Sequence, residues 1–141
     1  LNMETLWQQA YPSECVIVRP TGIYGTSVAR MIKLAETTKA YPKLHWSNRI
    51  HVEDLAAFLA HLLHVEHTEK SYICSNSQPL PLHEIIQWFQ QQLGLPVLVL
   101  ESAVSSGKQI HATRMQQMNF ELQHPHCFDD YLALLAERES K

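Results

Sequence analysis

The stretch of sequence that most constrains the fold runs from Cys15 to Val18, an uninterrupted series of apolar, mostly β-branched residues. A strand with one face in water alternates apolar and polar side chains, and this run has no polar position. The run is therefore typical of a strand covered on both faces, as in a parallel sheet. It is followed by Arg19 and Pro20, and then by two glycines, Gly22 and Gly25.

Periodic patterns along the rest of the chain predict that helices and strands alternate, which indicates an α/β fold. Helices are predicted at 1–10, 28–38, 51–67, 81–93, 112–118 and 127–140, strands at 14–18, 43–50, 71–74 and 96–100, and a turn at 105–107. In the predicted 43–50 strand, the side chains of Leu44, Trp46 and Ile50 share one face.

Polar residues and glycines at the ends of these segments support the boundaries. Thr26 or Ser27 can cap the helix over 28–38, and Gly94 can end the helix over 81–93. The helix over 51–67 has an apolar stripe, and Glu53 and Asp54 in its first turn suit the helix dipole. The stripe consists of Leu55, Phe58, Leu59, Leu62 and Leu63.

Bulk properties exclude several classes of protein. The 141 residues suffice for one domain with a core. The net charge is −3 and the Lys and Arg residues are scattered along the chain, so nucleic acid is not expected as a partner. No apolar stretch is long enough to span a membrane, and the first residues do not resemble a signal peptide. The chain begins in mid-pattern, as we expect of a piece of a longer protein.

The three cysteines are far apart and form no Cys-x-x-Cys pair, so we interpret them as small, buried apolar residues in a reducing compartment. A cytoplasmic location is therefore predicted.

The glycines invite the interpretation that Gly22 and Gly25 belong to a dinucleotide phosphate cradle. Such a loop begins directly at the end of a strand, so that backbone N–H groups can meet the pyrophosphate. Here Arg19 and Pro20 intervene, and proline has no N–H to donate. A third glycine would fall at Val28, so the spacing argues against the cradle.

The segments VIVRPTGIYG and NRIHVEDLAAFLAHLL together resemble the C-terminal half of the extended short-chain dehydrogenase/reductases, the NAD-dependent epimerase/dehydratase family. The resemblance extends from residue 15 to about residue 136. The family's Arg-Pro-x-x-x-Tyr-Gly segment is matched by Arg19, Pro20, Tyr24 and Gly25. The Arg, His-Val, Asp and Ala positions of a later family segment are matched by Arg49, His51, Val52, Asp54 and Ala56. Where family members usually carry glycine this chain has Asn119, which tolerates a left-handed backbone.

The resemblance implies the C-terminal part of a Rossmann-like NAD(P)-binding fold with a small substrate-side lobe and an incomplete parallel sheet. Residues 1–40 and 66–95 would belong to the Rossmann side, and residues 41–65 and 96–141 to the substrate side. The backbone of Pro20, Thr21, Gly22 and Ile23 would then lie near the cofactor. Tyr24 and Arg49 would contact the substrate, with nucleotide sugars as one candidate class.

The resemblance also implies that the reactive groups lie elsewhere. The family's Gly-rich loop and its catalytic Tyr-x-x-x-Lys precede the VIVRP strand, and no tyrosine of this chain has lysine four positions later. We therefore expect no catalytic residue here, no activity from the chain alone and no tightly bound cofactor. NAD or NADP would bind the whole protein.

Other interpretations of the same residues remain open. Arg49 could form a surface salt bridge, and Tyr24 could pack in the core with its hydroxyl on the backbone. His51 and Asp54 are better explained as helix-start residues than as catalytic ones. The whole protein could also be a non-catalytic binding module.

A metal-binding domain is the third functional alternative, based on His61, His64 and His67. His61 and His64 are one turn apart and could share a metal, but His67 drifts off that side of the helix, and we predict no native metal site. Since upstream strands would be missing, the 14–18 strand should leave an edge uncovered and promote self-association.

Overall fold

The computed structural model describes residues 2–141; Leu1, which the sequence places in the first helix, lies outside the described residues. The helices are α1 (Met3–Ala10), α2 (Ala29–Thr37), α3 (Val52–Leu62), α4 (Leu82–Gln92), α5 (Thr113–Gln116) and α6 (Cys127–Glu139). The strands are β1 (Ile17–Pro20), β2 (Gly22–Tyr24), β3 (Ala40–Tyr41), β4 (Leu44–Ser47), β5 (Arg49–His51), β6 (Ser71–Cys74), β7 (Leu80–Pro81), β8 (Val99–Leu100) and β9 (Ser105–Gly107).

Parallel pairing of short strands confirms the α/β class. Strand β1 pairs with β6, with Ile17 opposite Ser71, and β2 pairs with β5, with Gly22 opposite Arg49. Two further sets, β3–β8 and β7–β4–β9, complete the strand pairing, and one ladder, β4 with β7, is antiparallel. Among the described residues β1 has a single partner strand, so Ile17 and Val18 are only half-buried.

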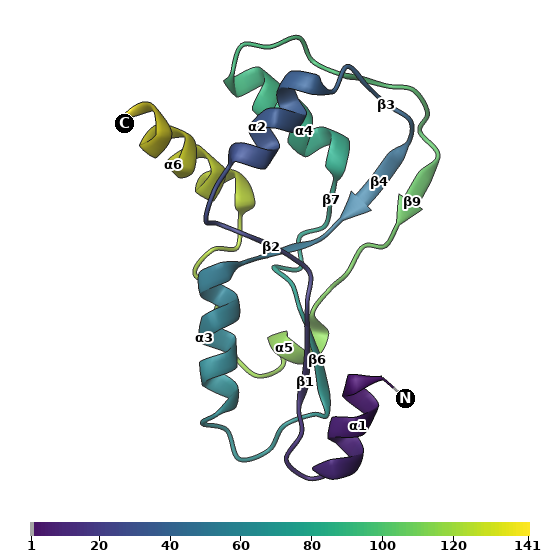
Figure 1. Ribbon diagram of the computed structural model, residues 1–141, viewed down its shortest axis with the longest axis vertical. Helices are drawn as coiled ribbons and strands as arrows, with labels where there is room; N and C mark the ends of the chain where they lie inside the picture. The colour runs from purple at the N-terminus through teal and green to yellow at the C-terminus, as the bar shows by residue number, and fades with distance from the viewer. Residues whose placement is uncertain (1) are drawn as a thin grey trace.

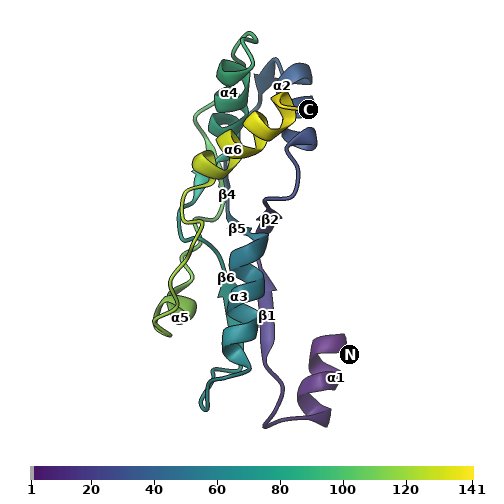
Figure 2. The same cartoon turned by 90° about the vertical axis from the view of Figure 1, so that its left-hand side faces the viewer.

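The chain is elongated and has a core at each end (Figures 1 and 2). At one end α2, α4 and α6 pack together around Ile32, Phe89 and Tyr131. At the other, α3, β6 and α5 enclose Phe58 and Tyr72. Strands β2 and β5 lie between the two ends (Figure 2). How these cores correspond to the two sides of a complete dinucleotide-binding fold stays a prediction.

Two predicted helix-end features are confirmed, and a third holds only in part. The N-cap of α2 is Val28, which makes no side-chain cap bond, although the hydroxyl of the preceding Ser27 accepts the backbone N–H of Ala29. Gly94 follows α4 with φ of 68°. Asn119, downstream of α5, has φ of 57°, in the left-handed region that asparagine tolerates best after glycine.

The prediction of one strand over 43–50 is wrong, because Asn48 separates β4 from β5. The Asn48 side chain donates to the carbonyl of Lys108 and accepts the N–H of Ile110. The residue thus connects the strand region to the chain that follows β9. The predicted turn at 105–107 is also wrong, since these residues form β9 and pair with β4. The strand predicted at 96–100 shortens to β8.

Part of the predicted apolar stripe of α3 faces water. Phe58 is fully buried, but Leu59 and Leu63 are exposed, and the helix ends at Leu62 rather than near residue 67. Helix α1 buries none of its residues. Its predicted apolar side, Met3, Leu6 and Trp7, is therefore exposed. No helix among the described residues is long and apolar enough to cross a membrane.

The cysteines are unpaired thiols. Cys74 and Cys127 are buried, as predicted, whereas Cys15 is half-buried. Burial raises the pKa of Cys74 to about 11. Burial also raises the pKa of Cys127, although the neighbouring Arg49 opposes the shift. Both thiols are therefore protonated at neutral pH and unreactive.

Candidate functional site

A cleft of about 210 Å³ opens where β2 and β5 meet α2, α4 and α6. It brings together the two motif segments that the sequence singles out, with Gly22, Ile23 and Tyr24 from β2 and Arg49 from β5. Parallel pairing of β2 with β5 places the segments side by side, since Gly22 lies opposite Arg49. The other lining residues are Gly25, Thr26, Ser27, Arg30, Met31, Ser47, Asn48, Leu82, Ile85 and Tyr131.

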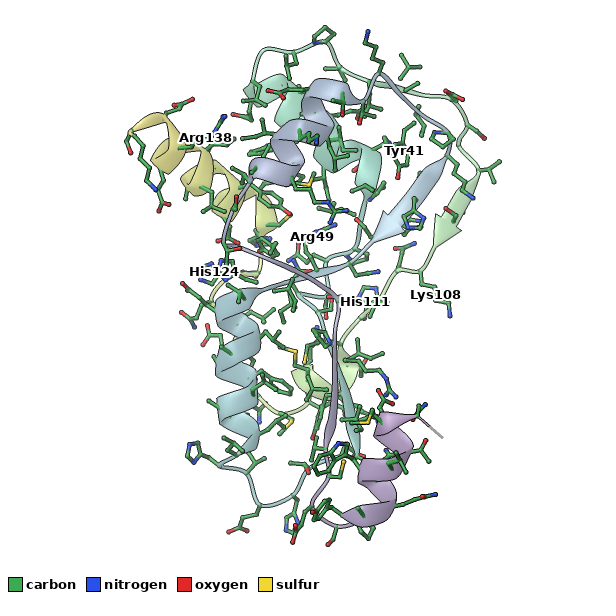
Figure 3. All side chains as sticks on the ribbon, viewed as in Figure 1. Tyr41, Arg49, Lys108, His111, His124 and Arg138 are labelled. Carbon is green, nitrogen blue, oxygen red and sulfur yellow. The ribbon has the colours of Figure 1, made fainter. Side chains whose placement is uncertain are left out.

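Arg49 is the most unusual residue of this cleft, because its side chain is 5% exposed and has no ionic partner. One guanidinium nitrogen donates to the hydroxyl of Ser47 at 2.5 Å, and the other terminal nitrogen, Nη1, is buried without a hydrogen-bond partner. No carboxylate of residues 2–141 lies within ion-pair distance of it. The alternative that Arg49 forms a surface salt bridge is therefore wrong. Figure 3 shows Arg49 near the middle of the molecule.

The cleft is positively charged. Arg30 and Arg49 line it, and the described lining residues include no aspartate or glutamate. The hydroxyls of Thr26, Ser27 and Ser47 also border it. A buried cation without a counter-ion is costly, and an anion whose oxygens accepted hydrogen bonds from the Arg49 guanidinium would supply the missing counter-charge.

The segment Pro20–Ile23 offers little hydrogen-bond donation to a cofactor. The N–H of Thr21 donates to the carbonyl of Cys74, and the N–H of Gly22 donates to the carbonyl of Asn48. Pro20 has no N–H, and Ile23 is 54% exposed. The segment can therefore present apolar surface and carbonyl oxygens to a neighbouring group, but no row of free N–H donors as a phosphate cradle would.

Tyr24 forms one wall of the cleft with its ring, while its hydroxyl is engaged elsewhere. The hydroxyl donates to Asp130 of α6 at 2.6 Å, and the ring packs edge-on against His51 and obliquely against Tyr131. Burial, followed by the hydrogen bond to Asp130, raises the pKa of Tyr24 far above its ordinary value. The phenol is therefore neutral, and it is a fixed donor rather than a base. The alternative in which the Tyr24 hydroxyl bonds to the backbone is therefore incomplete, because its short hydrogen bond goes to the carboxylate of Asp130.

His51 and Asp54 both act at the start of α3, in different ways. Nδ1 of His51 accepts the N–H of Glu53, which confirms the predicted helix-start role. Asp54 is 1% exposed, and its carboxylate accepts the N–H groups of Gln123 at 2.8 Å and His124 at 2.9 Å. Asp54 thus holds a segment about seventy residues away along the chain.

His124 is the residue of this region that sequence reasoning missed. Its Nδ1 lies 2.6 Å from Asp130, its Nε2 lies 2.9 Å from Glu53, and its ring stacks on His51 with centroids 3.6 Å apart. Burial alone lowers the pKa of His124, but the hydrogen bonds to Asp130 and Glu53 outweigh it and raise the pKa. Nothing local in the sequence signals this pairing, because the partners come from α3 and α6.

A metal ion fits these residues poorly. Among residues 2–141, one group of three metal-binding side chains comes together, with ligand atoms of His51, His124 and Asp130 within 4.8 Å of one another. The two imidazoles are nearly parallel, at 8°, so their in-plane lone pairs run side by side instead of converging. Both nitrogens of His124 already face carboxylates. We therefore interpret this group as a hydrogen-bonded network.

Known proteins resemble this chain in structure more clearly than in sequence. No protein-family model and no curated protein sequence matches it. A structure from Methylobacillus flagellatus, assigned as an NAD-dependent epimerase/dehydratase, is 31% identical, with a TM-score of 0.70, over 95% of this chain and 52% of that protein. A functionally unknown conserved protein from Silicibacter pomeroyi is 20% identical, with a TM-score of 0.67 and coverage of 95% and 53%.

More distant structures share the fold. The dTDP-glucose 4,6-dehydratase of Bacillus anthracis, solved in complex with NAD, is 15% identical, with a TM-score of 0.70 over 98% of this chain and 49% of the enzyme. This chain therefore spans about half the length of the solved structures that it matches.

Proposed function

We propose that this chain supplies the substrate side of an NAD-dependent epimerase/dehydratase, because it aligns with about half the length of structures that carry this description. The whole protein would use NAD or NADP to oxidise, epimerise or dehydrate a small substrate, with nucleotide sugars as the leading class. Two of the similar structures support this class in the names they carry, a dTDP-glucose 4,6-dehydratase and a UDP-N-acetylglucosamine 4-epimerase. The chain alone would be inactive.

One observation carries this proposal: the cleft unites Gly22, Ile23, Tyr24 and Gly25, the second half of the RPTGIYG segment, with a buried arginine that lacks a carboxylate partner. In the proposed assembly Arg49 binds an anionic group of the substrate, and the ring of Tyr24 forms the adjacent wall. The exposed side of Pro20–Ile23 faces the cofactor. The Gly-rich turn and the Tyr-x-x-x-Lys base would come from the other half of the fold.

Replacing Arg49 tests the anion site directly. We expect Arg49→Met to weaken binding of UDP or inorganic pyrophosphate to this chain about 10-fold or more, because hydrogen bonds to charged groups contribute about 1.5–3 kcal/mol. Arg49→Lys should lose part of the affinity, since lysine cannot bind bidentately. Calorimetric titration measures the affinities.

Stability should not account for this loss. A buried guanidinium without a carboxylate partner is replaced by an apolar side chain at little cost, so the unfolding midpoint of Arg49→Met should equal or exceed that of the original chain. Arg138→Met, an exposed change near the end of α6, is the matched control and should leave binding intact. Unchanged UDP and pyrophosphate affinity in Arg49→Met would contradict the anion site.

The enzyme assignment has a separate test in the coding sequence ahead of Leu1. We expect it to encode a Gly-rich turn and a Tyr-x-x-x-Lys segment. Absence of both would leave the non-catalytic binding module as the better interpretation. That module would bind a dinucleotide in the whole protein without turning over any sugar nucleotide. Elemental analysis without stoichiometric zinc or nickel would argue against the metal-binding alternative.

We also propose that the exposed N-terminal face, formed by α1 and β1, leads this chain to self-associate. Trp7 and Tyr11 border a hollow with Cys15, Val16 and Ile17, and Trp7 is 52% exposed. Exposed apolar surface beside an unpaired strand edge promotes pairing between copies. We propose separately that the protein resides in a reducing, cytoplasmic environment, which is consistent with its free thiols.

Sedimentation velocity should therefore show dimers or larger species whose proportion rises with concentration. Trp7→Gln should shift the distribution toward monomer. Leu63→Gln, which alters an even more exposed apolar residue outside this face, should not. A monomer at all concentrations would rule out self-association of this chain.

A further inference from the structure

We propose that His124 is a proton-dependent tie between α3 and α6 that sets how firmly the Tyr24 wall of the cleft is held. The proposal concerns this chain's own residues and holds whether or not the whole protein binds a dinucleotide. It rests on a continuous series of hydrogen bonds that begins at the cleft and ends at the surface.

The series starts at the hydroxyl of Tyr24, which donates to Oδ2 of Asp130 at 2.6 Å. Oδ1 of the same carboxylate lies 2.6 Å from Nδ1 of His124. Nε2 of His124 then lies 2.9 Å from Glu53, whose side chain is 73% exposed. His124 is the central member, and Figure 3 shows it beside the start of α3, between the two ends of the molecule.

The segment that carries His124 is fixed independently of its ring. The buried carboxylate of Asp54 accepts the backbone N–H groups of Gln123 and His124. The imidazole therefore stays in place between α3 and α6 when its protonation changes, and only its hydrogen bonds change. This anchoring makes a side-chain switch possible without unfolding the segment.

Every element packed against the imidazole presents an ionisable group. Helix α3 contributes Glu53 and Asp54, α6 contributes Asp130, β5 contributes the stacked ring of His51, and β2 contributes Tyr24 through Asp130. Three carboxylates thus surround one imidazole. Nδ1 of His51 accepts the N–H of Glu53, so this nitrogen is already occupied.

Protonation decides how many carboxylates His124 can bind. The imidazolium donates from both nitrogens, to Asp130 and to Glu53 together. Neutral imidazole has one N–H, so one carboxylate must face a lone pair. Glu53 is in water and can rotate away, whereas the Asp130 side chain is only 13% exposed. We therefore expect deprotonation to release Glu53 first and to loosen the link between the helices.

The sign of the pH dependence follows from the direction of the pKa shift. The folded state raises the pKa of His124 above its ordinary value of 6.5. The stabilisation is therefore fully present below that ordinary value and is lost as pH rises through the folded-state pKa. The unfolding temperature should fall over this interval.

NMR titration of the histidine rings in this chain tests the proposal. We expect the midpoint of His124 to lie above its ordinary value of 6.5. Glu53→Gln should shift the His124 midpoint downward and flatten the fall in unfolding temperature. Glu84→Gln is the matched control, because Glu84 is an exposed first-turn residue of α4.

A second measurement distinguishes a hydrogen-bonded link between α3 and α6 from a histidine whose pKa alone is raised. The ring signals of Tyr24 should shift with the same midpoint as His124, and this coupled shift should disappear in His124→Gln. A His124 midpoint at or below its ordinary value of 6.5 would overturn the proposal. Tyr24 signals that stay constant while His124 titrates would also overturn it. The same holds for a Glu84→Gln effect as large as that of Glu53→Gln.

Discussion

Gly25→Ala is expected to destabilise the chain by about 3 kcal/mol or more, since it combines backbone strain with a steric clash. Gly25 has φ of 118°, which L-residues rarely adopt. A Cβ at this position would lie 2.4 Å from Nε2 of His51. His51 cannot easily move away, because the residue is only 5% exposed and its ring stacks on that of His124.

Gly94→Ala separates the two contributions. Gly94 also has positive φ, at 68°, but a Cβ there would meet nothing within 4 Å. Its substitution should cost about 1 kcal/mol, from the left-handed backbone alone. Urea unfolding measures both variants. Equal losses would show that the contact with His51 contributes nothing, and adding His51→Ala to Gly25→Ala should recover part of the stability if the clash is real.

Asp54→Asn should cost about 3 kcal/mol, because one buried carboxylate accepts two backbone N–H groups. The amide keeps one acceptor oxygen and turns an NH₂ donor toward the other N–H. Asp54→Ala leaves both N–H groups without a partner and should cost at least as much. Asp129→Asn, an exposed change in the first turn of α6, is the control and should be nearly neutral.

Hydrogen exchange locates the effect. In the original chain the N–H groups of Gln123 and His124 should exchange slowly, and in Asp54→Asn at least one should exchange much faster. If both stayed protected while stability fell, the loss would have to arise from packing around α3 instead of from this crosslink. The measurement also reports on His124, since Asp54 fixes the segment that carries it.

Features whose signal lies within a few residues could be predicted from the sequence. The continuous apolar run before Arg19 predicted a parallel strand, and β1 pairs with β6 in parallel. Gly94 and Asn119 have local conformational signatures, and both adopt the positive φ that is expected of them. The motif segments pointed to Tyr24 and Arg49, and both line the cleft, while their roles in binding stay a prediction.

Boundaries that depend on distant contacts were wrong. Asn48 interrupts a pattern that otherwise alternates, and its partners lie about sixty residues later. The segment at 105–107 looks like a turn by composition, yet β4 is available to pair with it. Leu59 and Leu63 follow helical spacing, but burial depends on what packs against α3, which its own sequence does not specify.

The sequence by itself determined the alternation of helices and strands and the identity of the two motif segments, since backbone preferences and side-chain periodicity act over a few residues. Only the tertiary structure decided that Arg49 is buried without a carboxylate and that His124 lies between Glu53 and Asp130. The reason is that charge pairing and burial are set by distances through space, and residues separated by seventy positions become neighbours only when the chain folds.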